Sequence, residues 1–269
     1  MNGSYHAQRP PPEQPLIETD VDDRVLRIRI NRIERKNAIT VAMYTALAEA
    51  LERAAADAAV RVVLLHGDQQ VFTSGNDVAD FIEPSFGIDE HQPVFRFLRA
   101  ISTAAKPIVA AVSGPAIGIG TTMLLHCDLV YAGESARFHL PFVNLALVPE
   151  AASTLLLPAA IGYPRAAELM LLGEPFGAAK AREYGIVTDV VADGDVLDTA
   201  AAAARKLAGK PPAAVRLSKL LMKQGLADAI VQQMRDEARH FAAQRRSPEA
   251  VEAFTAFFEK RAPDFSKFD

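Results

Sequence analysis

The sequence predicts an α/β fold that ends in an all-helical region. Short strand-like segments alternate with helix-like segments between about residues 25 and 191, which is the pattern of an α/β core. From about Asp195 onward, every segment is helix-like. The chain has 269 residues, of which 50% are hydrophobic, so it is long enough to bury one large core.

Three regions follow from this change of pattern. Residues 1–15 are rich in proline and lack an apolar run, so we expect a disordered tail and not a signal peptide. Residues 16–200 are expected to form the core. Residues 201–269 are expected to form a helical region that packs on the core or on a neighbouring subunit.

The first part of the expected core contains two strands that flank a long helix. Residues 25–32 (VLRIRINR) alternate apolar and basic side chains, which is typical of a half-buried strand. Thr40 is suited to cap an alanine-rich helix that runs to about Ala59. Residues 61–67 (RVVLLHG) are a short apolar run that indicates a strand covered on both faces, and residues 72–77 favour a loop.

The rest of the core continues the alternation. We expect helices at 93–103, 118–126, 163–173 and 178–185, strands at 107–113, 128–132 and 186–191, and a Gly-Pro turn after residue 113. Helical segments follow at 198–210, 211–225 and 227–260.

Composition excludes several classes of protein. The net charge of −4 gives no sign of a nucleic-acid-binding surface. Cys127 is the single cysteine, so no disulfide can form within the chain, which fits a reducing, cytoplasmic location. The six histidines lack metal-ligand spacing, and no metal site is expected. His126 and His139 are interpreted as packing or capping residues.

One segment is long enough to span a membrane. Residues 107–127 carry no formal charge over 21 positions. Ser113, Gly114 and Pro115 interrupt the segment near its middle, so we interpret it as a buried strand, a turn and a buried helix. No membrane association is expected.

Two glycine-containing loops could bind an anion through backbone N–H groups. In residues 72–81 (FTSGNDVADF), Gly75 indicates an unusual backbone conformation that could leave N–H groups free; the alternative is an ordinary loop in which Asp77 caps a helix. In residues 114–120 (GPAIGIG), glycines open a helix. This second loop is not a dinucleotide fingerprint, because Met123 stands where a third small residue is needed.

A lone carboxylate lies in a third segment. Glu150 is the only charged residue among the 27 from Phe138 to Pro164. If it is buried, desolvation raises its pKa and suits it to proton transfer near neutral pH. Alternatively, it is a solvated acid at the start of a helix after Pro149. The segment by itself favours neither interpretation.

Taken together, these segments resemble the enoyl-CoA hydratase/isomerase (crotonase) family. The resemblance rests on the loop SGND, then KPIVAAVSGPAIGIG, CDLVYAGESARFHLPF and VPEAAS in this order, with ERKNAI at 34–39. It implies a spiral of ββα repeats, a helical C-terminal region that assembles homotrimers or hexamers, and acyl-CoA thioester substrates. CoA is then part of the substrate, and no separate cofactor is implied.

The resemblance also implies roles for individual residues. The backbone N–H groups of Asn76 and Ile119 would form an oxyanion hole for the thioester oxygen. Glu150 would be the catalytic acid and base. Substrate-binding positions are expected at Lys36, Ala38, Ser74, Gly75, Asp77, Gly118, Gly120, Thr122, Phe142 and Leu145.

Two departures from the family pattern indicate the reaction. Hydratase members carry two catalytic glutamates, at positions that are Thr122 and Phe142 here. A subgroup similar to the peroxisomal-type Δ3,Δ2-enoyl-CoA isomerases carries one glutamate, at the position of Glu150. We therefore expect an isomerase, with hydration or another acyl-CoA reaction as one alternative and a non-catalytic acyl-CoA-binding protein as the other.

Overall fold

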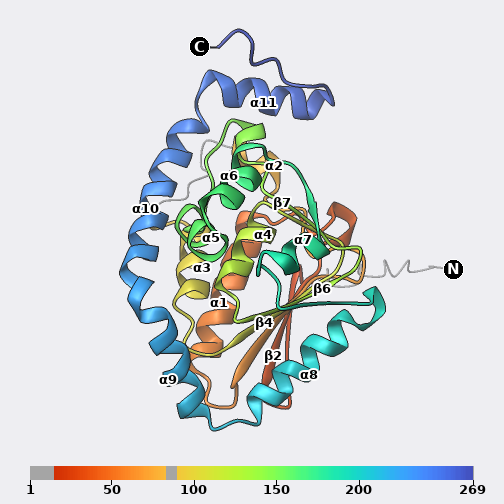
Figure 1. Ribbon diagram of the computed structural model, residues 1–269, viewed down its shortest axis with the longest axis vertical. Helices are drawn as coiled ribbons and strands as arrows, with labels where there is room; N and C mark the ends of the chain where they lie inside the picture. Colours follow the sequence, from red (N-terminus) through yellow and green to blue (C-terminus); the bar gives the residue numbers. More distant parts are fainter. Residues whose placement is uncertain (1–14, 83–89, 269) are drawn as a thin grey trace, which may run out of the picture.

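A six-stranded sheet runs through the centre of the protein (Figure 1), for which the computed structural model describes residues 15–82 and 90–268. The strand order is β1-β2-β3-β4-β6-β9, and all neighbours are parallel except β1 and β2. Of the expected tail, residues 1–14 lie outside the described residues. The strands are β1 (Ile17–Asp22), β2 (Val25–Ile30), β3 (Val62–His66), β4 (Ile108–Val112), β6 (Leu129–Gly133) and β9 (Asp189–Val191).

A smaller sheet of three strands lies beside the first. It consists of β5 (Pro115–Ile117), β7 (Arg137–His139) and β8 (Phe176–Gly177), in the order β5-β7-β8. Since β4 and β6 in the large sheet lead into β5 and β7 in the small one, and helices follow each pair, the expected ββα repeat is present.

The turn expected at Gly114-Pro115 is only partly correct. Gly114 does turn the chain, with φ of 62°, but Pro115 already begins β5. A Cβ atom on Gly114 would lie 1.9 Å from the Gln70 carbonyl oxygen, so only glycine fits where the chain passes between the sheets.

The helices largely follow the sequence expectation. Thr40 caps α1 by accepting a hydrogen bond from the Met43 N–H at 3.4 Å. Instead of one helix, α4 is followed by a tighter 3-10 turn, η2, which ends at His126. The helices are α1 (Val41–Ala56), α2 (Val78–Ile82), α3 (Pro93–Ser102), α4 (Ile119–Thr122), η2 (Met123–His126), α5 (Ser153–Ile161), α6 (Tyr163–Leu171), α7 (Ala178–Glu183), α8 (Val196–Ala208), α9 (Pro212–Lys223), α10 (Ala227–Gln244) and α11 (Pro248–Glu259).

The strand expected at 186–191 is shorter than predicted. Its first two residues close the end of α7, because the N–H groups of Ile186 and Val187 both donate to the Ala181 carbonyl. Of the expected strand 186–191, only β9 (Asp189–Val191) pairs with β6. The apolar character of Ile186 and Val187 therefore reflects packing in the core, where both are buried, and not strand pairing.

Each face of the large sheet has its own hydrophobic cluster. Alternate side chains of the parallel strands point to opposite faces. One face packs against α1 and α3, and it includes Ile28 and Leu65. The other packs against α8, whose small residues Ala200 and Ala204 are fully buried and allow close approach.

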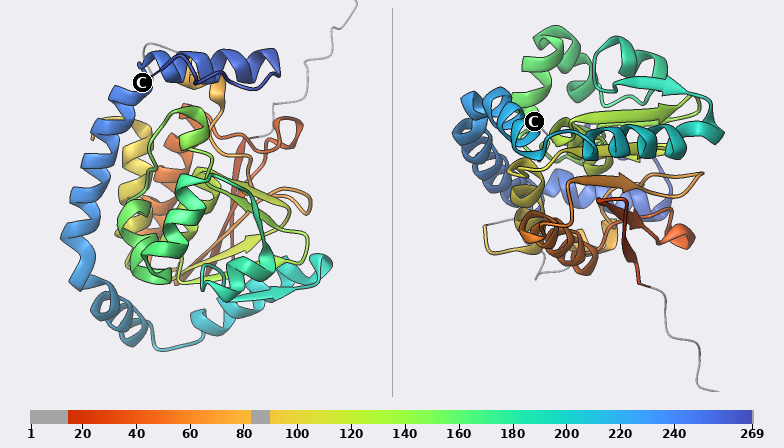
Figure 2. Two further views of the ribbon diagram at one scale, coloured as in Figure 1. Left: turned by 45° about the horizontal axis from the view of Figure 1, so that its top comes forward. Right: turned by 90° about the horizontal axis from the view of Figure 1, so that it is seen from below.

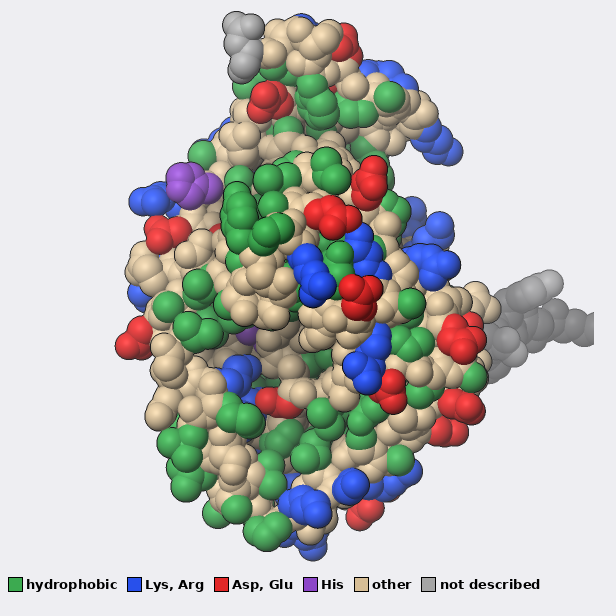
Figure 3. Space-filling view, in the orientation of Figure 1, with side chains coloured by type: hydrophobic (Ala, Val, Ile, Leu, Met, Phe, Trp, Pro, Cys, Tyr) green, Lys and Arg blue, Asp and Glu red, His purple; other side chains and the backbone are tan. Residues whose placement is uncertain are grey.

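The C-terminal helices wrap around the core (Figures 1 and 2). The expected boundary after residue 200 falls inside α8, which packs on the sheet, and this boundary stays a prediction. Helices α9 and α10 run along one side of the molecule, and α11 crosses one end. Figure 3 shows acidic and basic side chains interspersed over one face, and apolar side chains where α9 lies. On α9, Leu217, Leu220, Leu221 and Met222 are exposed.

No helix within residues 15–82 and 90–268 combines the length and the apolar composition that crossing a membrane requires. The uncharged segment 107–127 instead forms β4, β5, α4 and η2.

A buried ion pair fastens α9 to the sheet. The Lys219 ammonium lies 2.7 Å from the Asp128 carboxylate and donates to the Lys106 carbonyl at 2.9 Å. The same carboxylate accepts the Ile108 N–H at 2.7 Å, where β4 begins. Only 5% of the Lys219 side chain and 22% of the Asp128 side chain are exposed.

Removal of this cation is expected to destabilise the protein. The change Lys219→Met leaves Asp128 with an uncompensated charge, which should lower the free energy of unfolding by about 3 kcal/mol. Urea denaturation measures the effect, with Lys206→Met on the exposed side of α8 as the control. Equal stability of the two variants would contradict this role for the ion pair.

Candidate active site

Two loops meet beside the small sheet. The loop after β3 runs parallel to β5, since the Thr73 N–H donates to the Pro115 carbonyl and the Ile117 N–H donates to the Thr73 carbonyl, both at 3.0 Å. Gly75 has φ of 92°, and a Cβ atom there would lie 2.7 Å from the Ile117 carbonyl oxygen. The approach of the loops therefore requires glycine at position 75.

In each loop of the described chain, at least one N–H group has no acceptor. In the first loop, the N–H groups of Gly75 and Asp77 bond to Thr73 Oγ1 and the Ile39 carbonyl. In the second, Gly118 has φ of 57° and donates to the His139 carbonyl. Within the described chain, the backbone N–H groups of Asn76 and Ile119 have no hydrogen-bond partner. These are the two donors that the sequence predicted for an oxyanion hole.

Glu150 is buried, so its interpretation as a solvated helix-start residue is wrong. Its exposed fraction is 3%, and it precedes α5 instead of lying in the first turn. Burial raises the pKa of Glu150 to about 8, and the negative charge of Glu237 adds to this effect. At neutral pH this carboxyl can therefore both give and take a proton.

The Asn76 side chain connects the first loop to Glu150. Its Nδ2 donates to Glu150 Oε1 at 3.3 Å, and its Oδ1 accepts from the Tyr44 hydroxyl at 2.5 Å. The hydrogen bond from Asn76 opposes the rise in the pKa of Glu150. Tyr44 remains a neutral donor, because burial raises the pKa of its hydroxyl well above the ordinary value.

The backbone next to Glu150 has an uncommon conformation. Ala151 and Ala152 have φ of 65° and 54°, in the left-handed region that side chains rarely adopt. His126 Nε2 lies 2.8 Å from the Ala151 carbonyl oxygen. Because burial lowers the pKa of His126 to about 4, its ring is neutral and donates one proton to this carbonyl. The expectation that His126 has a packing role is confirmed.

Most of the other predicted site residues are buried or half-buried. Thr122 and Phe142 are buried, and the Thr122 hydroxyl has no hydrogen-bond partner. Leu145 is half-buried and packs against the core. Gly120 lies under the first loop, where a Cβ atom would be 2.6 Å from Thr73 Cγ2.

The region around residues 34–39 borders the same loop. The Ser74 N–H donates to the Lys36 carbonyl at 3.0 Å, and the Lys36 side chain is exposed. Ala38 is half-buried. The Asp77 carboxylate accepts from Arg32 at 2.7 Å and from the Ala79 N–H at 3.2 Å, which agrees with a helix-capping role. Substrate contacts of these residues stay predictions.

Sequence reasoning missed two residues of this site, Tyr44 and Glu237. Tyr44 is completely buried in α1, and its apolar neighbours conceal its hydroxyl contact. Glu237 does leave a signal: on α10 it belongs to one stripe of buried residues with Ile230, Met234 and Phe241. An acid at a position in a helical apolar stripe indicates a buried charge with a specific partner.

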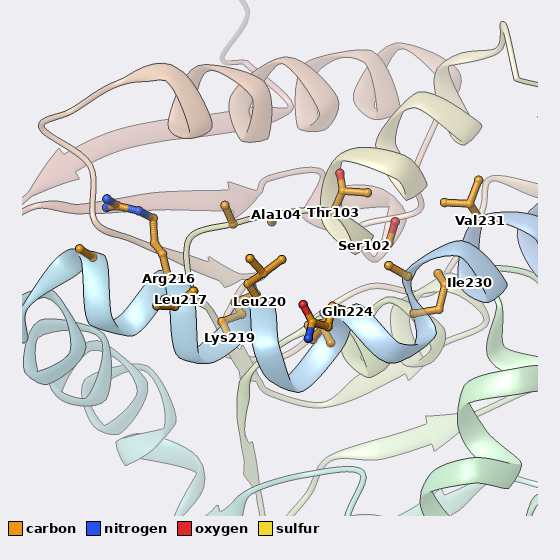
Figure 4. Close-up of a pocket in the computed structure, with 14 residues that line it drawn as sticks. Ser102, Thr103, Ala104, Arg216, Leu217, Lys219, Leu220, Gln224, Ile230 and Val231 are labelled. Carbon is orange, nitrogen blue, oxygen red and sulfur yellow. The ribbon is translucent and has the colours of Figure 1, made fainter.

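A separate cavity lies elsewhere. It has a volume of about 590 Å³ and lies between the end of α3 and helices α9 and α10 (Figure 4). Leu220 and Ile230 line it, together with Arg216. None of the predicted site residues lines this cavity.

Metal ligands are not gathered in the part of the chain that the structure describes. No group of three or more His, Cys, Asp or Glu residues there could hold an ion. The expectation that no metal is needed stays a prediction.

Comparison with known proteins places the chain in a family. The model of the enoyl-CoA hydratase/isomerase family matches residues 20–267. The chain belongs to this family. It is therefore an acyl-CoA-processing enzyme of the enoyl-CoA hydratase/isomerase type.

The relatives of this chain include both hydratases and isomerases. It is 32% identical to the 2,3-dehydroadipyl-CoA hydratase of Escherichia coli, over 90% of this chain and 95% of the relative. With the enoyl-CoA delta isomerase 2 of Rattus norvegicus it shares 33% identity over 88% of this chain, which spans only 62% of that relative. An enoyl-CoA hydratase/isomerase structure from Pseudoalteromonas atlantica is similar, with a TM-score of 0.90, 46% identity and coverage of 93% and 100%.

Substitution of Gly75 is expected to separate the two loops. The change Gly75→Ala places a methyl group against the Ile117 carbonyl at a positive φ, and should cost about 1–3 kcal/mol of stability. Affinity for an acyl-CoA should fall with it. Urea denaturation and calorimetric titration measure both quantities, and Gly194→Ala, where a Cβ atom meets nothing within 4 Å, is the matched control. Unchanged acyl-CoA affinity in Gly75→Ala would contradict the site geometry.

Neutralising Glu150 is expected to stabilise the enzyme at high pH. Its folded pKa of about 8 lies above the unfolded value, so the bound proton stabilises the folded state and this contribution is lost as pH rises toward 8. Relative to the wild type, Glu150→Gln should therefore gain stability as the pH rises from 4.5 to about 8, by on the order of a few kcal/mol. Thermal unfolding across this range measures the gain, with the exposed Glu134→Gln as the control. A difference between Glu150→Gln and wild type that does not vary with pH would refute the buried ionisable carboxyl.

Proposed function

We propose that this enzyme is a Δ3,Δ2-enoyl-CoA isomerase. The observation that carries the proposal is the buried carboxyl of Glu150, which the Asn76 side chain links to a loop with a free N–H group. Moving a double bond along an acyl chain requires one group that removes a proton from one carbon and returns it to another. One carboxyl whose pKa is about 8 meets this requirement.

The proposed reaction proceeds through a dienolate. The Glu150 carboxylate takes a proton from C2 of a 3-enoyl-CoA, and the electrons of the broken C–H bond move to the thioester oxygen. The N–H groups of Asn76 and Ile119 stabilise that oxygen as its charge develops; by analogy with other oxyanion holes, each contributes about 2.7–4 kcal/mol. The Glu150 carboxylic acid then returns the proton to C4, and the double bond lies between C2 and C3.

The surroundings of Glu150 suit a proton carrier. Burial favours the protonated form that exists while the dienolate is present, and the small exposure of Glu150 to solvent limits loss of the proton to water. The hydrogen bond from the Asn76 amide holds Oε1 in place and partly stabilises the carboxylate. These opposing effects keep both protonation states accessible near neutral pH.

Hydration is less well supported. It needs one group to activate water and another to protonate carbon, and the two positions where hydratases carry glutamates are Thr122 and Phe142. Glu237 is a second buried carboxyl, but both of its oxygens accept hydrogen bonds from residues 152–154. These hydrogen bonds already give Glu237 a structural role in holding the 152–154 segment.

A purely acyl-CoA-binding role leaves Glu150 unexplained. The free N–H groups could bind a thioester in either case. A buried carboxyl with a raised pKa costs stability at neutral pH, and such groups gather at catalytic sites. We further propose that the reaction uses no cofactor beyond the CoA of its substrate, and that the enzyme is a cytoplasmic homotrimer or hexamer; exposed apolar residues on α9 support self-association.

Loss of the Glu150 carboxylate is expected to abolish isomerisation. In Glu150→Gln, conversion of a 3-enoyl-CoA into the conjugated 2-enoyl-CoA should slow by about 10²–10⁴-fold, the usual contribution of a general base. Acyl-CoA affinity should remain, because the N–H groups are unchanged. Absorbance of the conjugated thioester follows the rate, and Glu134→Gln is the exposed control.

Two outcomes of this assay would overturn the proposal. One is a wild-type rate in Glu150→Gln. The other is rapid loss of the absorbance when the wild-type enzyme receives a 2-enoyl-CoA, which would show that hydration is its reaction.

A further inference from the structure

Glu237 is a carboxylate at a core position of α10. It shares the buried stripe of Ile230, Met234 and Phe241, and its exposed fraction is 5%. Burial of an ionised carboxylate is costly unless hydrogen bonds replace its water. The partners of Glu237 therefore indicate why the chain carries an acid at this position.

Among the described residues, the hydrogen-bond partners of Glu237 all lie just after Glu150. Glu237 Oε2 accepts the Ala152 N–H at 2.6 Å. Its Oε1 accepts both the N–H and the hydroxyl of Thr154, at 3.0 and 2.5 Å. Gln233, one turn earlier on α10, donates to the same Thr154 hydroxyl at 2.8 Å. The Glu237 carboxylate thus binds Ala152 and Thr154, which lie 85 and 83 positions before it in the sequence.

The turn that Glu237 holds is strained. Ala151 and Ala152 both have positive φ, at a cost of roughly 1–2 kcal/mol for each such residue. The turn leads into α5, a helix of nine residues whose N-cap residue, Ala152, has no side chain able to cap it. Glu237 supplies the missing acceptor from another helix, and an anion at a helix N-terminus is favourable.

We infer that Glu237 is a positioning residue for Glu150: its carboxylate holds the 151–154 turn that fixes the Glu150 backbone, and its negative charge acts on the Glu150 carboxyl. This inference rests on the proposed role of Glu150 as the proton carrier. Glu237 itself does not touch the substrate in this account. The role makes correct docking of α10 a condition for an active base.

The charges around Glu150 and Glu237 determine in which direction Glu237 shifts the pKa of Glu150. Burial raises the pKa of Glu237 to about 7, against the pull of its hydrogen bonds, and its charge in turn raises the pKa of Glu150. In the part of the chain that the structure describes, the titratable groups around Glu150 and Glu237 include Tyr44 on α1, His126 on η2, and Asp236, Arg239 and His240 on α10. Tyr44 and His126 are neutral near pH 7, since the pKa of Tyr44 is raised and that of His126 is lowered.

Removing the negative charge of Glu237 therefore has a defined sign. Without it, Glu150 loses its proton at lower pH. The two carboxyls titrate as a coupled pair, so the shift belongs to the apparent titration of Glu150 in each variant.

The test is the full-length enzyme with Glu237→Gln. Glutamine keeps the shape and one acceptor oxygen, but its amide nitrogen cannot accept a backbone N–H. Titration of the Glu150 carboxyl by ¹³C NMR, with its signal assigned by loss in Glu150→Gln, gives a readout independent of turnover. In Glu237→Gln we expect the apparent pKa of Glu150 to fall by about one unit, the low-pH limb of kcat to shift with it, and kcat to fall about tenfold with a smaller change in KM.

Two further variants separate the effect of the negative charge of Glu237 from the effect of its side-chain length. Asp236→Asn removes the same charge from the neighbouring residue of α10, which ion-pairs with Arg239 at the surface, and should leave both readouts unchanged. Glu237→Asp keeps the charge, but its side chain is one methylene shorter, so the carboxylate lies farther from the N–H groups of Ala152 and Thr154. This variant should lower kcat. If Glu237→Gln does not fold, Thr154→Val removes one donor of the same network and should shift the limb in the same direction, but less.

The outcomes distinguish this inference from the proposed function. An unchanged Glu150 titration together with an unchanged kcat in Glu237→Gln, or an equal shift in Asp236→Asn, overturns the inference while isomerisation by the wild type stands. A shifted titration in an enzyme that never isomerises 3-enoyl-CoA supports the coupling of Glu237 to Glu150 and overturns the proposed function instead.

Discussion

Burial of one carboxyl, that of Glu150, is the constraint on which the rest of the site depends. An acid with an exposed fraction of 3% has an unfavourable charged state, so its pKa rises to about 8. Four side chains near it stabilise its carboxyl or its backbone. The Asn76 amide and the Tyr44 hydroxyl form a chain of hydrogen bonds that supports the carboxylate. Glu237 and His126 hold the backbone that follows it.

The fold brings these groups together from distant parts of the sequence. The two glycine loops follow strands β3 and β4 of the large sheet. Backbone hydrogen bonds between the first loop and β5 of the small sheet hold the loops side by side. Glycines at 75 and 118 take positive φ values there, so the N–H groups of the following residues stay free. The C-terminal helix α10 then reaches back over the core and fastens the segment after Glu150. Stability is lost at the buried acids and recovered in the apolar clusters that surround them.

Much of this arrangement could be predicted from the sequence, because many of its elements depend on patterns of neighbouring residues. The alternation in 25–32, the cap at Thr40 and the glycine loops each rest on neighbouring residues, and all appear in the structure. The short strand β5 depends on its pairing with β7 in the small sheet, which no local pattern contains. Tyr44 and Glu237 were missed for the same reason: each acts on a residue more than 30 positions away.

Transfer of a proton between two carbons by the Glu150 carboxyl can be tested by labelling the transferred hydrogen. A 3-enoyl-CoA with deuterium at both C2 positions is converted in ordinary water, and the product is examined by mass spectrometry and NMR. We expect a 2-enoyl-CoA with one deuterium left at C2 and deuterium found at C4, since the buried Glu150 carboxyl returns the deuterium that it removed. A product with only ordinary hydrogen at C4, or no 2-enoyl-CoA at all, would contradict it.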